Sequence, residues 1–123
     1  MMVRGVRGAT TADSDSREAV VKSTAELLKE MLAQNDIDTD DLASVQFTTS
    51  PDLVAEFHAV AAREELGWKY VPLLNAVEID RPGAQGLCIR ILMLWNTERS
   101  QSEIKHVYLK GAVNLRADLA SAQ

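Results

Sequence analysis

The stretch Leu-Cys-Ile-Arg-Ile-Leu-Met-Leu-Trp-Asn, at residues 87–96, decides the fold. Apart from Arg90, the run is dominated by apolar and branched residues, a composition typical of a strand in the middle of a sheet. Side chains alternate across a strand, so Arg90 shares one face with Cys88 and Leu92. An isolated charge out of water is costly, and we therefore expect Arg90 to meet an anion. That anion is either a carboxylate of the protein or a ligand.

Length, composition and charge bound the class of protein. The chain has 123 residues, a mass of 13.5 kDa and 46% hydrophobic residues, which predicts one globular domain spanning residues 1–123. The net charge of −5 argues against nucleic acid as the principal partner, because phosphate binding needs a cationic surface. No segment resembles a signal peptide or the roughly 20 apolar residues of a membrane span. We therefore expect a cytoplasmic protein with no membrane contact.

Disulfide and metal chemistry are not expected. Cys88 is the single cysteine, so an intramolecular disulfide is excluded and a reduced, packed thiol is predicted. One cysteine with two distant histidines, His58 and His106, lacks the spacing of a tetrahedral zinc site. The acidic run at residues 36–41 lacks the glycine and the terminal glutamate of an EF-hand loop, and a polar turn is predicted there.

The N-terminal residues 2–11 have the composition of a first strand. Gly5 and Gly8 flank Arg7 within it. Glycine permits the close approach of a ligand or of another backbone, so one interpretation is a crowded, functional edge. The alternative is a solvated arginine beside a bulge.

The rest of the pattern predicts an α+β fold, a mixed sheet with two main helices. Asp15 and Glu18 resemble a capping box, and apolar residues then recur at helical spacing as far as Asn35. A second helix is expected at residues 55–66, ended by Gly67. Further strands are expected at residues 43–49, 68–79 and 105–109, and a polar tail at residues 114–123.

The strand at residues 68–79 and the Arg90 strand are separated by a loop and are expected to form a hairpin. Glu78 and Arg90 would then lie on neighbouring strands, with Glu78 as the counter-charge. The residues that break their local patterns are Arg7, Glu78, Arg90 and Tyr108, with Arg63 and Arg116 as outlying cations. They include no nucleophile and base pair, and they suit a small polyanion, because guanidinium groups bind carboxylates in bidentate geometry.

Short motifs occur in a fixed order along nearly the whole chain. They are Val3-Arg4-Gly5-Val6-Arg7-Gly8-Ala9-Thr10, Pro51-Asp52-Leu53, Phe57-His58-Ala59, Ala61-Ala62-Arg63, Val71-Pro72 with Glu78, Cys88-Ile89-Arg90, His106-Val107-Tyr108-Leu109 and Leu115-Arg116-Ala117-Asp118-Leu119. In this order and spacing the chain resembles the monofunctional chorismate mutases of the trimeric α/β-barrel type. The resemblance implies a homotrimeric pseudo-α/β-barrel with sites between subunits.

The resemblance also implies an activity, the conversion of chorismate to prephenate in phenylalanine and tyrosine biosynthesis, without a cofactor. It places Arg7 and Tyr108 on a substrate carboxylate. Arg90 would contact both a carboxylate and the ether oxygen of the breaking bond. Glu78 would accept a hydrogen bond from the ring hydroxyl.

Further substrate-binding residues implied by the resemblance come from several segments. They are Phe57, Ala59, Arg63, Leu74, Asn75, Leu115 and Arg116. Phe57 and Arg63 would come from the adjacent chain, because in this family the pocket lies between subunits. Leu115 and Arg116 would come from the C-terminal tail.

Three positions depart from the family pattern. Asn75 stands where some members have Cys, Val60 where some have Lys, and His58 where Pro is common. Leu74 and Asn75 would still line the pocket through backbone and a small polar side chain. Val60 removes a cation near the rim and is expected to weaken substrate attraction.

The expected chemistry needs neither acid nor base. A Claisen rearrangement is pericyclic and intramolecular, so positioning and electrostatic stabilisation suffice. Two other classes of protein remain open. One is a non-catalytic trimeric binding module for a small dicarboxylate, and the other is a structural oligomer in which Arg7 and Arg90 are ion-paired within the protein. Position 90 separates catalysis from sensing, because only catalysis needs a donor placed at the ether oxygen.

Overall fold

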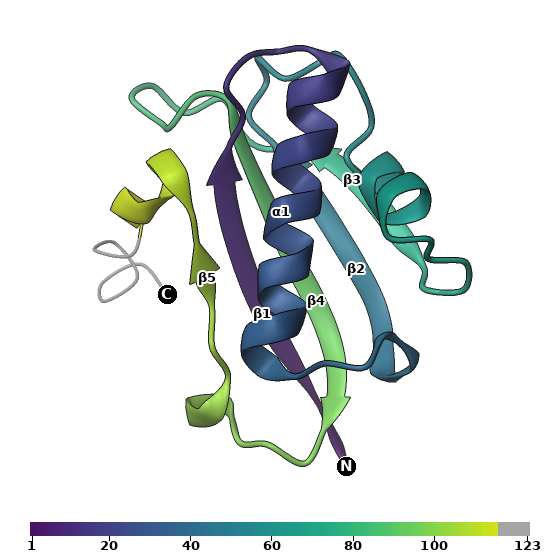
Figure 1. Cartoon of the computed structure of the whole chain (residues 1–123). Helices are drawn as coiled ribbons and strands as arrows, with labels where there is room; N and C mark the ends of the chain where they lie inside the picture. Colours follow the sequence, from purple (N-terminus) through teal and green to yellow (C-terminus); the bar gives the residue numbers. More distant parts are fainter. Residues whose placement is uncertain (116–123) are drawn as a thin grey trace.

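A computed structural model describes residues 1–115, whose five strands form one mixed sheet in the order β3-β2-β4-β1-β5 (Figure 1). The strands are β1 (Met2–Thr11), β2 (Leu42–Thr49), β3 (Leu73–Val77), β4 (Cys88–Thr97) and β5 (Val107–Tyr108). β4 is antiparallel to both β1 and β2, whereas β5 runs parallel to β1 and β3 runs parallel to β2. The predicted α+β class and the central position of the Arg90 strand are confirmed.

The long helix α1 (Arg17–Asn35) was predicted with the right end but the wrong cap. Ser16 is the N-cap, and its side chain accepts a hydrogen bond from a backbone N–H of the first turn at 3.2 Å. Asp15 Oδ1 instead accepts the backbone N–H groups of Val54 and Ala55, at 3.0 and 2.9 Å. The carboxylate that was expected to cap the helix therefore ties a distant loop to it.

The core lies between α1 and one face of the sheet. Ile89, Ile91 and Met93 of β4 are at most 2% exposed on this face, which we call the covered face. Gly8 of β1 lies so close to α1 that a Cβ there would overlap Met31 Sδ. The close approach expected from the glycines thus occurs at Gly8, and the neighbour is a helix side chain and not a ligand.

The second helix is shorter than the predicted residues 55–66. It is η2 (Ala61–Glu65), a π-helix that packs on the covered face beside α1 (Figure 1). The Ala59 N–H donates to Asn75 Oδ1 at 3.1 Å, and the N–H groups of residues 54 and 55 are held by Asp15. Side chains distant in sequence therefore bind the N–H groups of residues 54, 55 and 59, and the helix starts later than predicted. Short 3₁₀ turns complete the described chain at η1 (Thr39–Asp41), η3 (Gln101–Glu103) and η4 (Lys110–Asn114).

The predicted hairpin between the Glu78 and Arg90 strands is wrong. β3 pairs with β2 and not with β4, so β2 lies between the two residues. The central strand β4 already has both edges occupied, by β1 and β2, which leaves no edge for β3. β3 and β5 are also shorter than the predicted strands at residues 68–79 and 105–109. Pro72, which has no N–H to donate, immediately precedes β3.

The opposite face of the sheet, which we call the open face, carries Arg90. Along β4, Arg90, Leu92 and Leu94 are each half-buried and alternate with the buried residues of the covered face. Both α1 and η2 lie on the covered face, so neither helix shields this side. Arg90 is therefore less buried than the apolar sequence around it predicted.

Candidate active site

Two arginines stand side by side on the open face. In the antiparallel register of β1 and β4, Arg7 pairs with Leu92 and Ala9 pairs with Arg90. Paired residues of neighbouring strands point to the same side of a sheet, so Arg7 and Arg90 are diagonal neighbours. Strand register thus brings together two cations that lie far apart in the sequence.

Both arginines line two adjoining cavities, of about 930 and 350 Å³. Glu78 and Leu115 line the same two cavities, and Tyr108 lines the smaller one. The volumes suit a small organic ligand. The cavities therefore unite four predicted catalytic residues, Arg7, Glu78, Arg90 and Tyr108.

Glu78 reaches this site from across β2. It follows β3 directly, and its backbone N–H donates to the Thr49 carbonyl at 2.8 Å. Within residues 1–115 no ion pair joins Glu78 to Arg90. The expectation that Glu78 is the direct counter-charge of Arg90 is therefore wrong, because β2 separates the strands that carry them.

Cys88 lies on the wall of the larger cavity, two residues before Arg90. Its thiol is free and buried, as predicted. Burial raises the pKa of the thiol, and the charge and hydrogen bonding of Arg90 only partly oppose this effect. A protonated thiol is a weak nucleophile, so Cys88 does not offer covalent catalysis at neutral pH.

Tyr108, on the edge strand β5, and Leu115 form the side of the site that lies beyond β1. Tyr108 pairs with Ala9 in the short parallel ladder between β5 and β1. Tyr108, Ala9, Ala112 and the half-buried Leu115 pack together in a small apolar cluster. Ala9 is also the register partner of Arg90, so β1 lies between Tyr108 and Arg90, and both residues line the smaller cavity. Arg116, the next predicted binding residue, lies outside the described residues.

His106 contacts Arg7 through the backbone. Its Nδ1 accepts the Arg7 N–H at 3.0 Å, which requires an unprotonated Nδ1. Burial, and secondly the charge of Arg7, lowers the pKa of His106. The sequence motif around Tyr108 contains His106, yet nothing in the motif indicated that its ring would support the backbone of β1.

The hydroxyl of Thr48 was not predicted as part of the site. Thr48 is the register partner of Arg90 on β2 and lines the smaller cavity. Its buried Oγ1 has no hydrogen-bond partner among the described residues. A buried hydroxyl without a partner is unfavourable, so this atom is available to a bound ligand.

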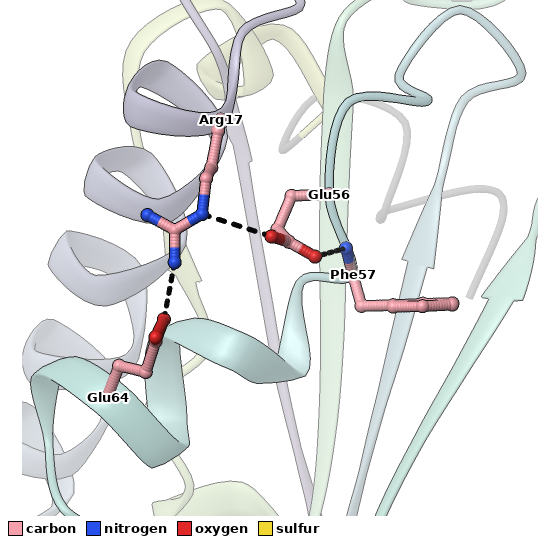
Figure 2. A network of polar contacts seen from close by, with 4 residues as sticks. All are labelled: Arg17, Glu56, Phe57 and Glu64. Atoms are coloured by element: carbon pink, nitrogen blue, oxygen red, sulfur yellow. Dashed lines mark hydrogen bonds and ion pairs between the residues drawn. The ribbon is translucent and has the colours of Figure 1, made fainter.

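Phe57 and Arg63 do not line either cavity of their own chain. Phe57 is 67% exposed, and Arg63 is exposed on η2. In Figure 2 the Phe57 ring points away from a network of ion pairs that holds its backbone. Arg17 joins Glu56 at 3.1 Å and Glu64 at 2.6 Å, and Glu56 accepts the Phe57 N–H at 2.8 Å. The network therefore presents Phe57 outward.

Leu74 and Asn75 lie on opposite faces of β3. Leu74 pairs with Gln46 on the open face and is 59% exposed. Asn75 pairs with Phe47 of the core, and its amide oxygen accepts the Ala59 N–H. The side chain of Asn75 is thus engaged on the covered face, where it also fixes the buried Ala59.

The two other departures from the family pattern are buried. Val60 is 8% exposed and belongs to the main core cluster. His58 is 2% exposed, its Nε2 has no partner within residues 1–115, and burial lowers its pKa to about 4. Neither residue lines the cavities.

Comparisons with known proteins agree on one family. A family model described as chorismate mutase type I matches residues 3–119. Chorismate mutase AroH of Thermus thermophilus is 50% identical over 123 residues, covering 99% of this chain and 100% of the relative. Chorismate mutase AroH of Bacillus subtilis (strain 168) is 41% identical over 120 residues, covering 98% of this chain and 94% of the relative. The solved chorismate mutase from Clostridium thermocellum has a TM-score of 0.89 and 44% identity, covering 91% of this chain and 99% of that one.

These matches, with the α+β fold and its arginine-lined cavity, define an isomerase. The chain belongs to the type I chorismate mutase family. Its function is that of a chorismate mutase in aromatic amino acid biosynthesis. The family implies chorismate as the substrate and prephenate as the product.

Proposed function

We propose that chorismate rearranges to prephenate in the cavities lined by Arg7, Glu78 and Arg90. The observation that carries this proposal is the diagonal placement of Arg7 and Arg90 on the open face, with Glu78 on the same cavity wall. Chorismate carries two carboxylates, and two guanidinium groups complement them in bidentate geometry. Holding both carboxylates selects the compact conformer in which the reacting ends of the substrate meet.

Arg90 would supply the electrostatic part of catalysis. As the ether bond breaks, negative charge grows on its oxygen, and a preorganised donor there stabilises the transition state more than the ground state. By analogy with single oxyanion donors, such a contact lowers the barrier by roughly 2.7–4 kcal/mol. The half-buried position of Arg90 on a strand with both edges paired supports this assignment, because the backbone that carries it is held rigidly.

The other residues of the cavities would orient the substrate. Glu78 would accept a hydrogen bond from the ring hydroxyl, and Tyr108 would join Arg7 at a carboxylate. Leu115 would cover the substrate from the start of the tail, with Arg116 beyond it. The buried hydroxyl of Thr48 beside Arg90 is available for one further hydrogen bond.

The protein would work as a homotrimer with sites between subunits. Phe57 and Arg63 are exposed and line neither cavity of their own chain, which supports their role in the site of a neighbouring subunit. The exposed apolar residues on or beside the open face include Val3, Leu74 and Ile79, which are 52–88% exposed. Exposed apolar surface of this kind marks an interaction face.

We place the enzyme in the cytoplasm and expect it to need no cofactor. None of the helices among the described residues is long and apolar enough to cross a membrane. In the same residues, no cluster of three or more histidine, cysteine or acidic side chains could hold a metal ion. The rearrangement itself consumes no proton, electron or external nucleophile, so the arginines and Glu78 are sufficient for it.

The direct test is to follow the ultraviolet absorbance of chorismate with the purified protein, before and after chelation. Turnover that survives chelation is the expected result. Tight binding of prephenate or another dicarboxylate without turnover would instead favour a binding module.

Shared sites are tested by mixing two impaired variants, Arg90→Ala and Arg63→Ala, under conditions of subunit exchange. Sites that combine wild-type residues from both chains should recover activity. A fully active monomer by light scattering would contradict the trimeric site.

A further inference from the structure

The strand that carries Arg90 begins beside a residue with an unusual backbone conformation. Leu87 has a φ of 48°, in the left-handed region. An L-residue with a bulky side chain is disfavoured there by roughly 1–2 kcal/mol. Leu87 directly precedes β4 and lies three residues before Arg90. Something in the fold must therefore hold Leu87 in place.

Asp52 is the main holder of Leu87. The Leu87 N–H donates to both carboxylate oxygens of Asp52, at 2.9 and 3.1 Å. On its other side, the Leu87 carbonyl accepts the Ala12 N–H at 2.8 Å. Gly86 leaves room for this arrangement, because a Cβ at that position would lie 2.9 Å from Asp52 Oδ2.

Ser50 completes the arrangement and couples it to β4. Its hydroxyl donates to Asp52 Oδ1 at 2.5 Å and its Oγ accepts the Cys88 N–H at 2.8 Å. The Ser50 hydrogen bond, followed by that of the Leu87 N–H, lowers the pKa of Asp52. Asp52 thus stays ionised at neutral pH, and a charged acceptor makes the stronger hydrogen bond.

The same residues form the wall of the proposed active site. Ser50, Asp52, Gly86, Cys88 and Arg90 all line the larger cavity. The torsion at Leu87 sets the direction in which β4 leaves the preceding loop, and side chains then alternate from that point. A change at Leu87 would therefore be transmitted to the guanidinium of Arg90.

We propose that Asp52 is a positioning residue that holds Leu87 in its left-handed conformation and thereby fixes the position of Arg90 in the cavity. The proposal rests on the proposed role of Arg90 in the rearrangement. It gives a purpose to the Pro51-Asp52-Leu53 motif, which none of the predicted substrate contacts uses. Asp52 itself is exposed, so its effect is expected on turnover more than on stability.

The test is a double-mutant cycle between Asp52 and Leu87. Asp52→Ala removes the acceptor, and kcat should fall about 5- to 30-fold, the change that corresponds to 1–2 kcal/mol of backbone preference. KM should change less, because Arg7 and the remaining wall are intact. Adding Leu87→Gly should restore most of the kcat, since glycine adopts a positive φ without penalty.

Two companion variants keep the cycle interpretable. Leu87→Asn tolerates a positive φ while retaining a larger side chain, and it should also rescue Asp52→Ala. Asp52→Asn keeps a carbonyl acceptor, serves if the alanine variant does not fold, and should show a smaller loss that Leu87→Gly again relieves. Asp41→Ala, which removes an exposed carboxylate on η1, is the charge control and should leave kcat unchanged.

Each contrary outcome contradicts either the role of Asp52 or the proposed function, and not both. A fall in melting temperature with an unchanged kcat would reduce Asp52 to a structural cap and overturn the proposal. An equal kcat loss with and without the Leu87 substitutions would also overturn it, because Asp52 would then act on the substrate directly. A wild-type protein without mutase activity would instead defeat the proposed function, so the two failures are distinguishable.

Discussion

The two faces of β4 differ in how deeply their side chains are buried within the chain. On the covered face, Ile89, Ile91 and Met93 lie beneath helices of the same chain and are almost fully buried. On the open face, Arg90 and Leu92 come from the same strand yet remain half-buried. The covered face stabilises the fold, whereas the open face carries the charged groups of the candidate site and exposed apolar residues. Stability and chemistry are therefore separated across the thickness of one sheet.

The largest expected effect is on the covered face. Phe47 is fully buried against the core, and Phe47→Ala should lower the free energy of unfolding by about 3–5 kcal/mol. Denaturant titration measures this change. Gln46 immediately precedes Phe47 and lies on the open face, so Gln46→Ala should leave the free energy of unfolding nearly unchanged. Equal losses for the two variants would erase the difference between the faces.

Arg90→Lys should have the opposite profile, with a large loss of turnover and little loss of stability. Lysine keeps the charge but not the planar fork, so kcat should fall about 10²- to 10³-fold, the effect of losing one oxyanion donor. Steady-state kinetics should show a smaller change in KM.

Arg4→Lys is the matched control for this variant. Arg4 lies on β1 opposite Trp95, toward the covered face, and its Nε donates to the Arg99 carbonyl. Its kcat should match the wild type. If Arg90→Lys raised KM and kept kcat, Arg90 would be an anchoring cation and the electrostatic mechanism would be wrong.

The free energy of unfolding and the turnover should also differ in their dependence on pH. Burial lowers the pKa of His58 to about 4, so the unfolded chain, with a pKa near 6.5, binds the proton first as the pH falls. Stability contributed by neutral His58 is complete above pH 6.5 and is lost as the pH falls from about 6.5 to about 4. Unfolding measured across this range should show a loss of at most about 1.4 kcal/mol per pH unit from this group.

His58→Leu should remove that part of the slope. Turnover, in contrast, should stay nearly constant above pH 6.5, because the rearrangement transfers no proton. A bell-shaped rate profile centred near neutrality would contradict this expectation.

The smallest effect is expected at Arg17. The Arg17→Gln variant loses its ion pairs with Glu56 and Glu64, which lie at the surface, so the unfolding midpoint should scarcely move. If the network positions Phe57 for a neighbouring site, KM should rise slightly with kcat unchanged. The KM of Arg17→Lys should lie between those of the wild type and Arg17→Gln, because one ammonium cannot bind both carboxylates in the same geometry. A KM identical to the wild type in both variants would show that Phe57 needs no such support.

Local patterns predicted the elements of the fold but not their neighbours. Alternation and branched residues identified β1 and β4, and apolar spacing located the end of α1 at Asn35. The hairpin was predicted wrongly because strand pairing depends on which edges are already occupied. The second helix was overestimated because Asn75 and Asp15, both distant in sequence, determine the bonding of residues 54–59.

Of the predicted site residues that the structure describes, Arg7, Glu78, Arg90, Tyr108 and Leu115 line the two cavities, whereas Phe57, Ala59, Arg63, Leu74 and Asn75 do not. Arg7 and Arg90 stood out as cations in apolar strands, and the family resemblance indicated the other site residues. Their diagonal placement depends on the register between β1 and β4, which no local pattern encodes. His106 and Asp52 were missed because each acts through a backbone N–H that only the folded chain brings near.

The lengths of the strands also bear on how the chain would associate in the proposed trimer. The sheet is long in the middle, where β1, β2 and β4 have 8–10 residues, and short at its edges, where β3 has five and β5 has two. Long unpaired edges promote fibre-like aggregation by strand addition, and short edges limit it. The two edge strands therefore offer little backbone of their own for misdirected pairing, and the proposed trimer would form through the exposed apolar side chains instead. Association in the proposed trimer would depend on side-chain packing, which closes, and not on sheet extension, which does not.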